Sequence, residues 1–305
     1  SATTLLTQAT VATSGTLTVT IPAAATGEFY KIRLSSTSPI DTVIIGNLFT
    51  VVTQSQCNCT DETVIDWQAS FGGTLSDELN IMIPTSDGGY LLGGASASNA
   101  SGNKTRNTFG LTDFWVVKID ANGTKQWDSI YGGISNDRLT TIISTTDGGY
   151  LLGGRSESIA SGNKTRNTFG GSDYWLIKID ANGTKQWDSV YGGIADDYCT
   201  TIHPVNDGFL LGGNSLSTIS GNKTSNGFGF SDYWLIKINV NGAKQWDITF
   251  GGTSDDIFSS IVSTSDGGYI LGGHSQSNAN GNKTRNSFSF GLRDYWLIKI
   301  NANGV

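Results

Sequence analysis

Cysteine, histidine, proline and methionine are scarce in this chain of 305 residues, which contains three, two, four and one of them, respectively. Cys57 and Cys59 are separated by a single residue, a spacing too short for an easy mutual disulfide, so no disulfide framework is expected. Cys199 takes a position that is apolar in the other copies of an internal repeat, and we expect a buried thiol there. The two histidines, His203 and His274, are too few for the usual structural zinc sites.

Basic charge and long apolar runs are also missing. Lys and Arg number 19 against 26 Asp and Glu, which gives a formal net charge of -7 and an isoelectric point near 4.7. A nucleic-acid partner is therefore not expected. No apolar run approaches the roughly 18 residues of a membrane-spanning helix, so we expect no membrane insertion. The chain begins Ser-Ala-Thr without the pattern of a signal peptide, which is typical of a mature protein or an excised fragment.

Glycine, by contrast, is abundant, with 40 residues, and a block of about 60 residues recurs four times almost letter for letter. The string Asn-Lys-Thr marks the four repeats, at residues 103–105, 163–165, 222–224 and 282–284. A period in this range indicates a repeat array in which one supersecondary unit is stacked or arranged in a ring.

The second repeat shows the expected strands. Short β-rich segments alternate with turn signals, and the dipeptide Asn182-Gly183 predicts a hairpin with a type I′ turn. Four antiparallel strands in a repeat of this length describe one blade of a β-propeller. The predicted strands cover residues 139–146, 150–158, 174–180 and 185–191.

All eight tryptophans fall at repeated positions of this scheme. In the third predicted strand, Trp175 shares a face with Ile177 and Ile179, whereas Lys178 points to the other face. We expect the tryptophans to anchor packing between sheets rather than to contact a cofactor. The third strands contain Trp115, Trp175, Trp234 and Trp296, and the fourth strands contain Trp67, Trp127, Trp187 and Trp246.

The two ends of the array predict how it closes. The last repeat stops after its third predicted strand, and residues 63–73 match the fourth strand and Gly-Gly link at 125–133. We therefore predict an all-β protein with a propeller of four four-stranded blades, in which this N-terminal strand closes the last blade and removes the exposed edges. The propeller domain would cover residues 56–305.

Residues 1–55 lack the repeat. Alternating apolar positions predict three or four strands of a small immunoglobulin-like β-sandwich segment. About 55 residues are few for an independent domain of this type, so the segment is either incomplete or docked on the propeller. Residues 53–62 are predicted to form the linker.

Two repeated polar elements are expected on one face of the propeller. The loop between the second and third strands emerges on the same face as the link from the fourth strand to the next blade. Together they offer amide, cationic and carboxylate groups, a mixture that suits polyhydroxylated or anionic ligands such as glycans. The candidate binding residues in the loops are Asn103, Lys104, Arg106, Asn163, Lys164, Arg166, Asn222, Lys223, Asn282, Lys283 and Arg285, and those in the links are Asp77, Asp137, Asp197 and Asp256.

A second interpretation of the same residues is structural. Asn and Thr side chains can satisfy the backbone of their own loop, and Lys and Arg can pair with nearby Asp. Repeats can share a loop because it folds well, so the sequence leaves both interpretations open.

No catalytic residue and no metal ligand is predicted. Catalysis needs groups in different roles, whereas near-identical repeats present the same groups again and again. No nucleophile elbow or metalloprotease motif occurs, so we expect no enzyme. No cofactor is expected, with calcium left open. Pairs of oxygen-bearing residues recur at 136–137, 196–197 and 255–256, but calcium takes six to eight oxygens and no EF-hand string is present.

Three strings characterise the repeat, namely Asp147-Gly-Gly-Tyr-Leu-Leu-Gly-Gly, Ser172-Asp-Tyr-Trp-Leu-Ile-Lys-Ile-Asp-Ala-Asn-Gly and Gln186-Trp-Asp-Ser-Val-Tyr-Gly-Gly. A repeat with these strings resembles repeats of large secreted and surface proteins of the Bacteroidota. Those proteins include cargo of the type IX secretion system and gliding-type adhesins. The resemblance covers residues 63–305. It implies an extracellular or cell-surface location and a parent protein with further domains.

These observations lead to an expectation for function. We expect an extracellular binding or adhesion module that recognises glycans or surface proteins through the Asn-Lys-Thr-Arg loops. The alternative is a structural spacer or assembly module of a large fibre or adhesin, and an enzyme acting on glycans ranks behind both.

Overall fold

The computed structural model describes residues 65–288 and 291–304, together with four short strands among the first 50 residues. The chain divides into two compact units, Ser1–Asp66 and Trp67–Val305. The described residues form strands, turns and loops only, and none of them belongs to a helix that could cross a membrane. The all-β class predicted from the sequence is therefore confirmed.

The first unit contains two short antiparallel pairs. β1 (Phe29–Tyr30) pairs with β4 (Phe49–Thr50), and β2 (Arg33–Ser35) pairs with β3 (Thr42–Ile44). Most of the predicted immunoglobulin-like strands and the predicted linker lie outside the described residues, so the sandwich stays a prediction.

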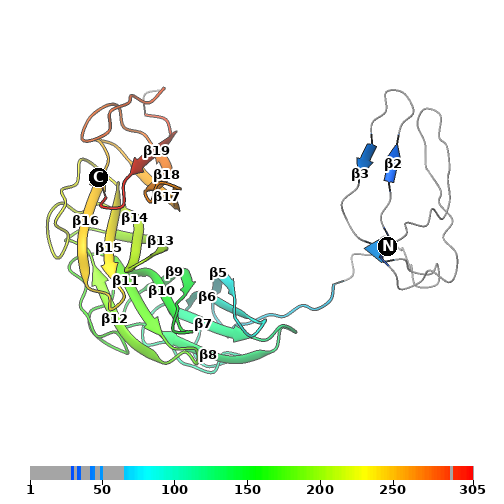
Figure 1. The fold of residues 1–305 in the computed structure, drawn as a ribbon. Helices are drawn as coiled ribbons and strands as arrows, with labels where there is room; N and C mark the ends of the chain where they lie inside the picture. Colours follow the sequence, from blue (N-terminus) through cyan, green and yellow to red (C-terminus); the bar gives the residue numbers. More distant parts are fainter. Residues whose placement is uncertain are drawn as a thin grey trace. The chain divides into compact units, whose positions relative to one another are not determined.

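The second unit contains one antiparallel sheet for each repeat, and the strands of each sheet lie in sequence order (Figure 1). The first three sheets have four strands and the fourth sheet has three, which confirms the predicted strand order. The first sheet consists of β5 (Asp77–Pro84), β6 (Tyr90–Ser96), β7 (Asp113–Ile119) and β8 (Lys125–Tyr131). The second consists of β9 (Asp137–Ser144), β10 (Tyr150–Ser156), β11 (Asp173–Ile179) and β12 (Lys185–Tyr191). The third consists of β13 (Asp197–Val205), β14 (Gly208–Ser215), β15 (Asp232–Asn239) and β16 (Lys244–Phe250). The fourth consists of β17 (Asp256–Ser263), β18 (Tyr269–Ser275) and β19 (Asp294–Ile300).

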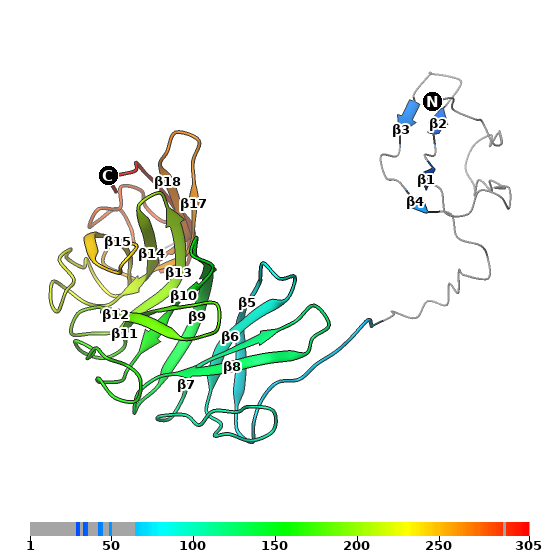
Figure 2. The same cartoon turned by 60° about the horizontal axis from the view of Figure 1, so that its bottom comes forward.

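The sheets pack face to face in a series. β5, β9, β13 and β17, the first strands, contact one another in that order, so the first strands line the inner side of an arc (Figures 1 and 2). β7, β11 and β15 are buried along almost their whole length, because each is covered on one or both faces by a neighbouring sheet. The alternation predicted for the third strand is confirmed, since Trp175, Ile177 and Ile179 share one apolar cluster.

The hairpin at Asp180–Gly183 forms, but its predicted turn type is wrong. Gly183 has φ of 80°, and no described residue other than glycine has positive φ, so Asn182 does not adopt the conformation that a type I′ turn requires. Instead Oδ1 of Asp180 accepts hydrogen bonds from the backbone nitrogens of Asn182 and Thr184, at 2.9 and 2.8 Å. The aspartate side chain organises the turn, and glycine is needed only at its last position.

The predicted closure of the last sheet is also wrong. β19 pairs with β18 alone, and the described part of the predicted closing strand, residues 65–73, forms no strand. Residues 70–73 are held by the first repeat instead, where Nδ2 of Asn103 donates to the carbonyl of Ser70 at 2.7 Å. The first repeat and the fourth repeat thus form the two ends of an open series.

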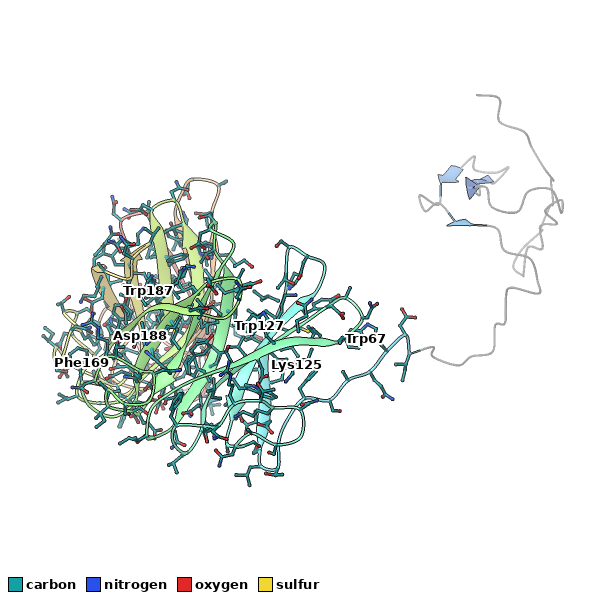
Figure 3. The ribbon with its side chains drawn as sticks, turned by 90° about the horizontal axis from the view of Figure 1, so that it is seen from below. Trp67, Lys125, Trp127, Phe169, Trp187 and Asp188 are labelled. Atoms are coloured by element: carbon teal, nitrogen blue, oxygen red, sulfur yellow. The ribbon has the colours of Figure 1, made fainter. Side chains whose placement is uncertain are left out.

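The tryptophans have the packing roles that the repeat predicts. Trp175 and Trp234 are completely buried, and each stacks on an aromatic ring of the preceding repeat. Trp127 and Trp187 are half-buried and lie against Gly183 and Gly242 of the following hairpin. Figure 3 shows Trp67, Trp127 and Trp187 at successive places along the series.

Cys199 is buried in the cluster between the second and third sheets, as expected. Burial raises the pKa of its thiol to about 12, which makes it an unreactive apolar group.

Candidate binding site

The loop that follows the second strand of each repeat contains the Asn-Lys-Thr string. We call these segments the long loops, at residues 97–112, 157–172, 216–231 and 276–293. The turn before the Asn-Lys-Thr string is shared by the four repeats, because Gly102 and its equivalents adopt φ near 59° beside the backbone of the preceding segment. A Cβ at Gly102 would lie 2.4 Å from the carbonyl oxygen of Gly72, so only glycine fits there.

The asparagine of the string joins its loop to the preceding repeat. Oδ1 of Asn163 accepts from the backbone nitrogen of Gly132 at 2.9 Å, and its Nδ2 donates to the carbonyl of Ile130 at 2.9 Å. The same pair of bonds is made by Asn103, Asn222 and Asn282. The four asparagines therefore use both ends of their amides to hold the junctions between repeats.

The lysine of the string points into the protein. Lys104, Lys164, Lys223 and Lys283 are all buried. Nζ of Lys104 donates to the carbonyls of Ser98 and Arg106, each at 2.6 Å, and Lys283 makes the equivalent pair of bonds. Burial lowers the pKa of Lys104, and it lowers the pKa of Lys164 to about 8. In this conformation the ammonium groups support the loop backbone from inside.

An aspartate that was not among the residues predicted from the sequence is the centre of the loop network in each of the first three repeats. Asp128 accepts hydrogen bonds from Thr105 Oγ1 at 2.6 Å, Trp115 Nε1 at 3.1 Å and Lys125 Nζ at 2.8 Å. Burial would raise the pKa of its carboxyl, but the hydrogen bonds from Lys125, Thr105 and Trp115 hold it below the usual value. The signal was present in the sequence, because Gln-Trp-Asp recurs at this position in the first three repeats.

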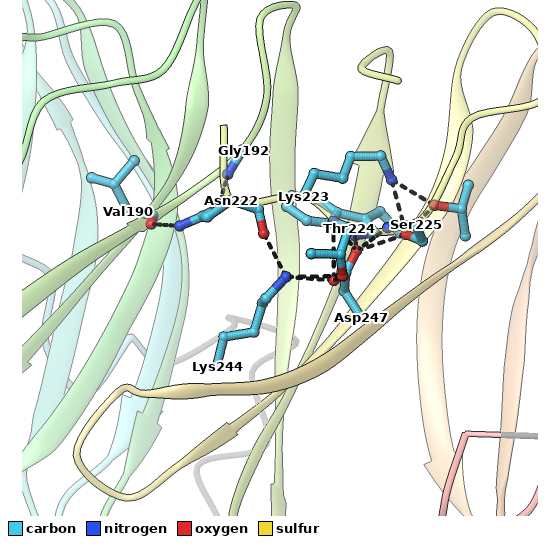
Figure 4. A network of polar contacts seen from close by, with 10 residues as sticks. Val190, Gly192, Asn222, Lys223, Thr224, Ser225, Lys244 and Asp247 are labelled. Atoms are coloured by element: carbon cyan, nitrogen blue, oxygen red, sulfur yellow. Dashed lines mark hydrogen bonds and ion pairs between the residues drawn. The ribbon is translucent and has the colours of Figure 1, made fainter. Parts of the chain in front are cut away.

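The third repeat varies this arrangement (Figure 4). Ser225 replaces the loop arginine, and its hydroxyl donates to Asp247 Oδ2 at 2.7 Å. Lys223 turns to Thr249 Oγ1 at 2.5 Å instead of to a loop carbonyl. Asp247 is the counterpart of Asp128, and Lys244 and Thr224 remain bound to it.

Three of the link aspartates, Asp137, Asp197 and Asp256, are buried, and Asp77 is half-buried. Oδ2 of Asp137 accepts from Gly133 N at 2.7 Å and from Ser158 Oγ at 2.8 Å, which ties the link to the long loop of its own repeat. Asp77, Asp197 and Asp256 make the same two contacts. Burial raises the pKa of Asp137. These carboxylates therefore shape the links and are covered by them.

A second aspartate of each repeat is the first residue of the third strand. Oδ2 of Asp113 accepts from the backbone nitrogen of Phe109 at 2.5 Å, while its Oδ1 has no partner. Burial raises the pKa of Asp113 to about 7, and a smaller contribution comes from the nearby carboxylate of Asp137. Asp173 and Asp232 are in the same situation, with pKa values raised to about 7.

An open groove lies where the first long loop meets the second repeat. Its volume is about 380 Å³, and the side chains of Arg106, Asn107, Phe109 and Tyr131 line one side. Asn163, Gly183 and Lys185 of the second repeat line the other side. The Tyr131 hydroxyl donates to the carbonyl of Gly183 at 2.5 Å and so fixes the floor.

Arg106 is the free cation of this groove. It is exposed, and its guanidinium has no hydrogen-bond or ion-pair partner among the described residues. The ring of Phe109 lines the same groove, half-exposed and in contact with Gly162. The structure thus places the loop asparagines at the links to the preceding repeats and the lysines beneath their own loops. Of the three predicted side-chain types in the loops, only the arginines have no side-chain partner among the described residues.

No group of three or more His, Cys, Asp or Glu side chains suited to a metal ion occurs among the described residues. Asp196, one of the residues considered for calcium, accepts from Ser172 N at 2.8 Å and from the Tyr198 hydroxyl at 2.8 Å. His203 lies 2.7 Å from Ser263 Oγ. Asp196 thus has hydrogen-bond partners within the protein, and calcium binding stays an untested possibility.

Comparison with known proteins gives little further direction. No protein-family model matches the chain. A stretch of 75 residues is 33% identical to part of the regulatory protein FlaEY of Caulobacter vibrioides. That stretch is 25% of this chain but only 8% of the length of FlaEY, so the similarity is to a small piece of a much longer protein.

Proposed function

We propose that the repeats form an open, propeller-like array that acts as an extracellular or cell-surface binding module without catalytic activity. Its ligand would be an anionic or polyhydroxylated glycan, bound in the grooves at the repeat junctions. The observation that carries this proposal is the groove lined both by Arg106, whose guanidinium is unpaired among the described residues, and by the half-exposed ring of Phe109. The resemblance of the repeat to secreted and surface proteins supports the location.

The groove has the chemistry for such a ligand. A guanidinium binds a carboxylate or sulfate through two parallel hydrogen bonds. An aromatic ring beside it can take the apolar face of a sugar, and the amide groups of Asn107 and Asn163 border the same space. The binding residues proposed from the sequence are thereby narrowed, with the loop arginines in the leading role and the lysines in a supporting one.

The site is repeated, but not in every repeat. The residues that line it at the first junction have identical or similar counterparts at the second, including Arg166, Phe169, Tyr191 and Lys244. At the third junction Ser225 takes the place of the arginine. Two neighbouring sites would strengthen the binding of a long glycan that spans them, because the second contact is made at high effective concentration.

A glycan array that includes sulfated and uronic acid glycans, followed by calorimetry on the best hit, tests this function. The variant Arg106→Ala/Arg166→Ala should lose the hit. Arg285→Ala is the matched control, because this arginine lies in the same loop motif of the last sheet, which has no following sheet to complete a groove. Ser225→Arg should add binding. An array without hits, or a hit that survives the double substitution, would contradict the proposal.

A structural role is the second candidate. The bonds of Asn163 and Asp137 hold the link between the first two repeats, and Lys164 supports its own loop, which is what a spacer or assembly module of a larger extracellular protein needs. Such a module would contact other domains of its parent protein or further surface proteins.

A further inference from the structure

We propose that the two ends of the repeat series bind each other between separate copies of the chain, so that copies associate head to tail. The trailing face is the exposed side of the fourth sheet, with Tyr295 and Leu297 of β19. The leading face is the exposed side of the first sheet, with Leu79 and Met82 of β5, and the segment 67–71 that lies along it. This inference is independent of the ligand groove.

The three junctions inside the chain provide the template. At each junction an aromatic ring of one third strand stacks on the tryptophan of the next third strand. The ring centroids are 4.8 Å apart for Phe114 and Trp175, 4.9 Å for Tyr174 and Trp234, and 4.9 Å for Tyr233 and Trp296. The two tyrosines also donate through their hydroxyls to the carbonyls of Trp234 and Trp296, at 3.2 Å. The same junction has therefore formed three times from the same types of residue.

The trailing face has the side chains that, at the internal junctions, pack on the tryptophan of the next sheet. Tyr295 takes the position of Tyr174 and Tyr233, which are completely buried, yet it is 96% exposed. Leu297 is 69% exposed, although its counterparts Leu176 and Leu235 are buried. These side chains stand on β19, whose outer edge pairs with no strand of the described residues.

The leading face has the residues that, at the internal junctions, receive the aromatic ring of the preceding sheet. Leu79 is 59% exposed and Met82 is 54% exposed, whereas Leu139 and Ile142, their counterparts in the second sheet, are buried against the first sheet. A groove of about 270 Å³ opens beside them, and Gly94 and Trp115 are among the residues that line it. In the next repeats the equivalents of Gly94 and Trp115 receive the aromatic ring, as Gly213 and Trp234 receive Tyr174.

The segment 67–71 lies on the leading face in the position that a fourth strand of a preceding sheet would have. Trp67 lies against Gly123 as Trp127 lies against Gly183, and Ser70 is bonded to Asn103 as Ile130 is bonded to Asn163. The segment thus contacts the first repeat in the same way as β8, the fourth strand of the first sheet, contacts the second repeat. It lacks only the third strand with which a fourth strand pairs.

The internal registers predict how β19 of another copy would pair with this segment. In the second sheet Tyr174 is opposite Tyr191, Leu176 is opposite Ser189 and Lys178 is opposite Trp187. The same register places Tyr295 opposite Phe71, Leu297 opposite Ala69 and Lys299 opposite Trp67. The added strand would complete the fourth sheet and cover both exposed faces in one step.

A second copy of the chain is the occupant that these faces fit. Within the described part of the second unit three junctions have formed, and the side chains on its two outer faces are exposed. Because the two faces differ and are complementary, the contact is heterologous, and repetition of it produces chains of molecules or a closed ring of several copies. An unpaired edge strand flanked by exposed apolar side chains is also a known site of association between chains.

Cysteine cross-linking tests the register and the occupant together. In a background with Cys57→Ser and Cys59→Ser, a chain carrying Leu297→Cys is mixed with a chain carrying Ala69→Cys and oxidised. Opposed residues in antiparallel strands lie within disulfide range, so a cross-linked heterodimer is expected as the main product. Thr184→Cys in place of Ala69→Cys is the control, because Thr184 is exposed on a hairpin of the second repeat, away from the predicted register. No heterodimer, or equal yields with the control, would overturn the proposal.

The double variant Leu297→Cys/Ala69→Cys separates two copies from one. Cross-linked oligomers support the association of copies, whereas a monomer that is cross-linked within itself overturns it. Sedimentation provides a measurement without cross-linking. The parent chain should show larger species as its concentration rises, and Tyr295→Asp should stay monomeric, since Tyr295 is exposed and its replacement leaves the sheet intact. A parent chain that is monomeric at all concentrations would contradict the proposal, and the groove variants Arg106→Ala/Arg166→Ala should leave association unchanged.

Discussion

Oδ1 of Asn163 accepts a hydrogen bond from the backbone nitrogen of Gly132 at 2.9 Å, while Nδ2 of the same side chain donates to the carbonyl of Ile130. One side-chain amide thus bonds a backbone N–H and a backbone carbonyl of the preceding repeat, the two kinds of group that a neighbouring strand would bond. The long loops are therefore parts of the junctions between repeats, and their substitution tests the fold before it tests ligand binding.

Asn163→Ala should lower the free energy of unfolding by about 1–3 kcal/mol, because two backbone groups at a junction lose their partner. Chemical denaturation of the purified chain measures this. Asn122→Ala is the matched control, since Asn122 is exposed in a hairpin turn and should change the stability by less than about 0.5 kcal/mol. Equal effects of the two substitutions would contradict the conclusion that Asn163 holds the junction between the first two repeats.

Lys164→Ala should destabilise the chain by about 2–4 kcal/mol, because it removes buried packing and leaves the carbonyl of Arg166 without its donor. Lys164→Met keeps the length of the side chain and should recover the packing part of the loss. Thermal unfolding of both variants provides the measurement. If both melt with the parent chain, the ammonium group is not a support of the loop.

The buried aspartates predict a dependence of stability on pH. Burial raises the pKa values of Asp113, Asp173 and Asp232 to about 7 from a usual value of 3.8. Between these values the folded chain binds more protons than the unfolded chain. The stabilising contribution of the three groups is therefore complete below about pH 4 and is lost as the pH rises through about 7.

Melting temperatures between pH 4 and pH 8 measure this effect. The triple variant Asp113→Asn/Asp173→Asn/Asp232→Asn keeps similar side-chain shapes without ionisable groups, so its melting temperature should fall less than that of the parent over the same interval. Identical pH profiles of parent and variant would show that these three groups do not titrate in this interval.

Asp188→Asn should destabilise the second loop network by about 2–4 kcal/mol. The carboxylate accepts from Thr165 Oγ1 at 2.6 Å, Trp175 Nε1 at 3.1 Å and Lys185 Nζ at 2.8 Å, and an amide cannot replace all three acceptor contacts. Since Trp175 is one of the donors, the change should also alter the tryptophan emission of the folded chain. A variant with the stability and emission of the parent would contradict the central role of Asp188.

The strands of the repeats could be predicted from the sequence because their signals are local. Alternation in the third strand, the Asp-Gly-Gly turns and the repeated tryptophans each indicate structure within a few residues. The turn at Asn182 was predicted wrongly because Asn-Gly permits a type I′ turn, whereas the side chain of Asp180 selects another geometry. Competition between two local signals cannot be decided from the dipeptide alone.

The site was less predictable for a different reason. A lysine in a polar loop is normally solvated, so nothing in the string Asn-Lys-Thr indicates that Lys104 is buried beneath its own loop. Lys104 Nζ donates to the carbonyl of Ser98, and the neighbouring Thr105 is held by Asp128, which lies 23 residues later in the sequence than Thr105. The attachment of residues 70–73 to the first repeat was hidden for the same reason, because it rests on Asn103 rather than on the strand pattern.

The contrast between β11 and β19 has a consequence for how the chain unfolds. β11 is buried along its whole length between two neighbouring sheets, whereas the side chains of β19 alternate between exposed and covered positions. In a linear array each unit is stabilised mainly by its nearest neighbours, so terminal units open first. Amide hydrogens should therefore exchange slowest in β11 and β15 and fastest in β19, and the loss of order should spread inward from the ends like the fraying of a short helix.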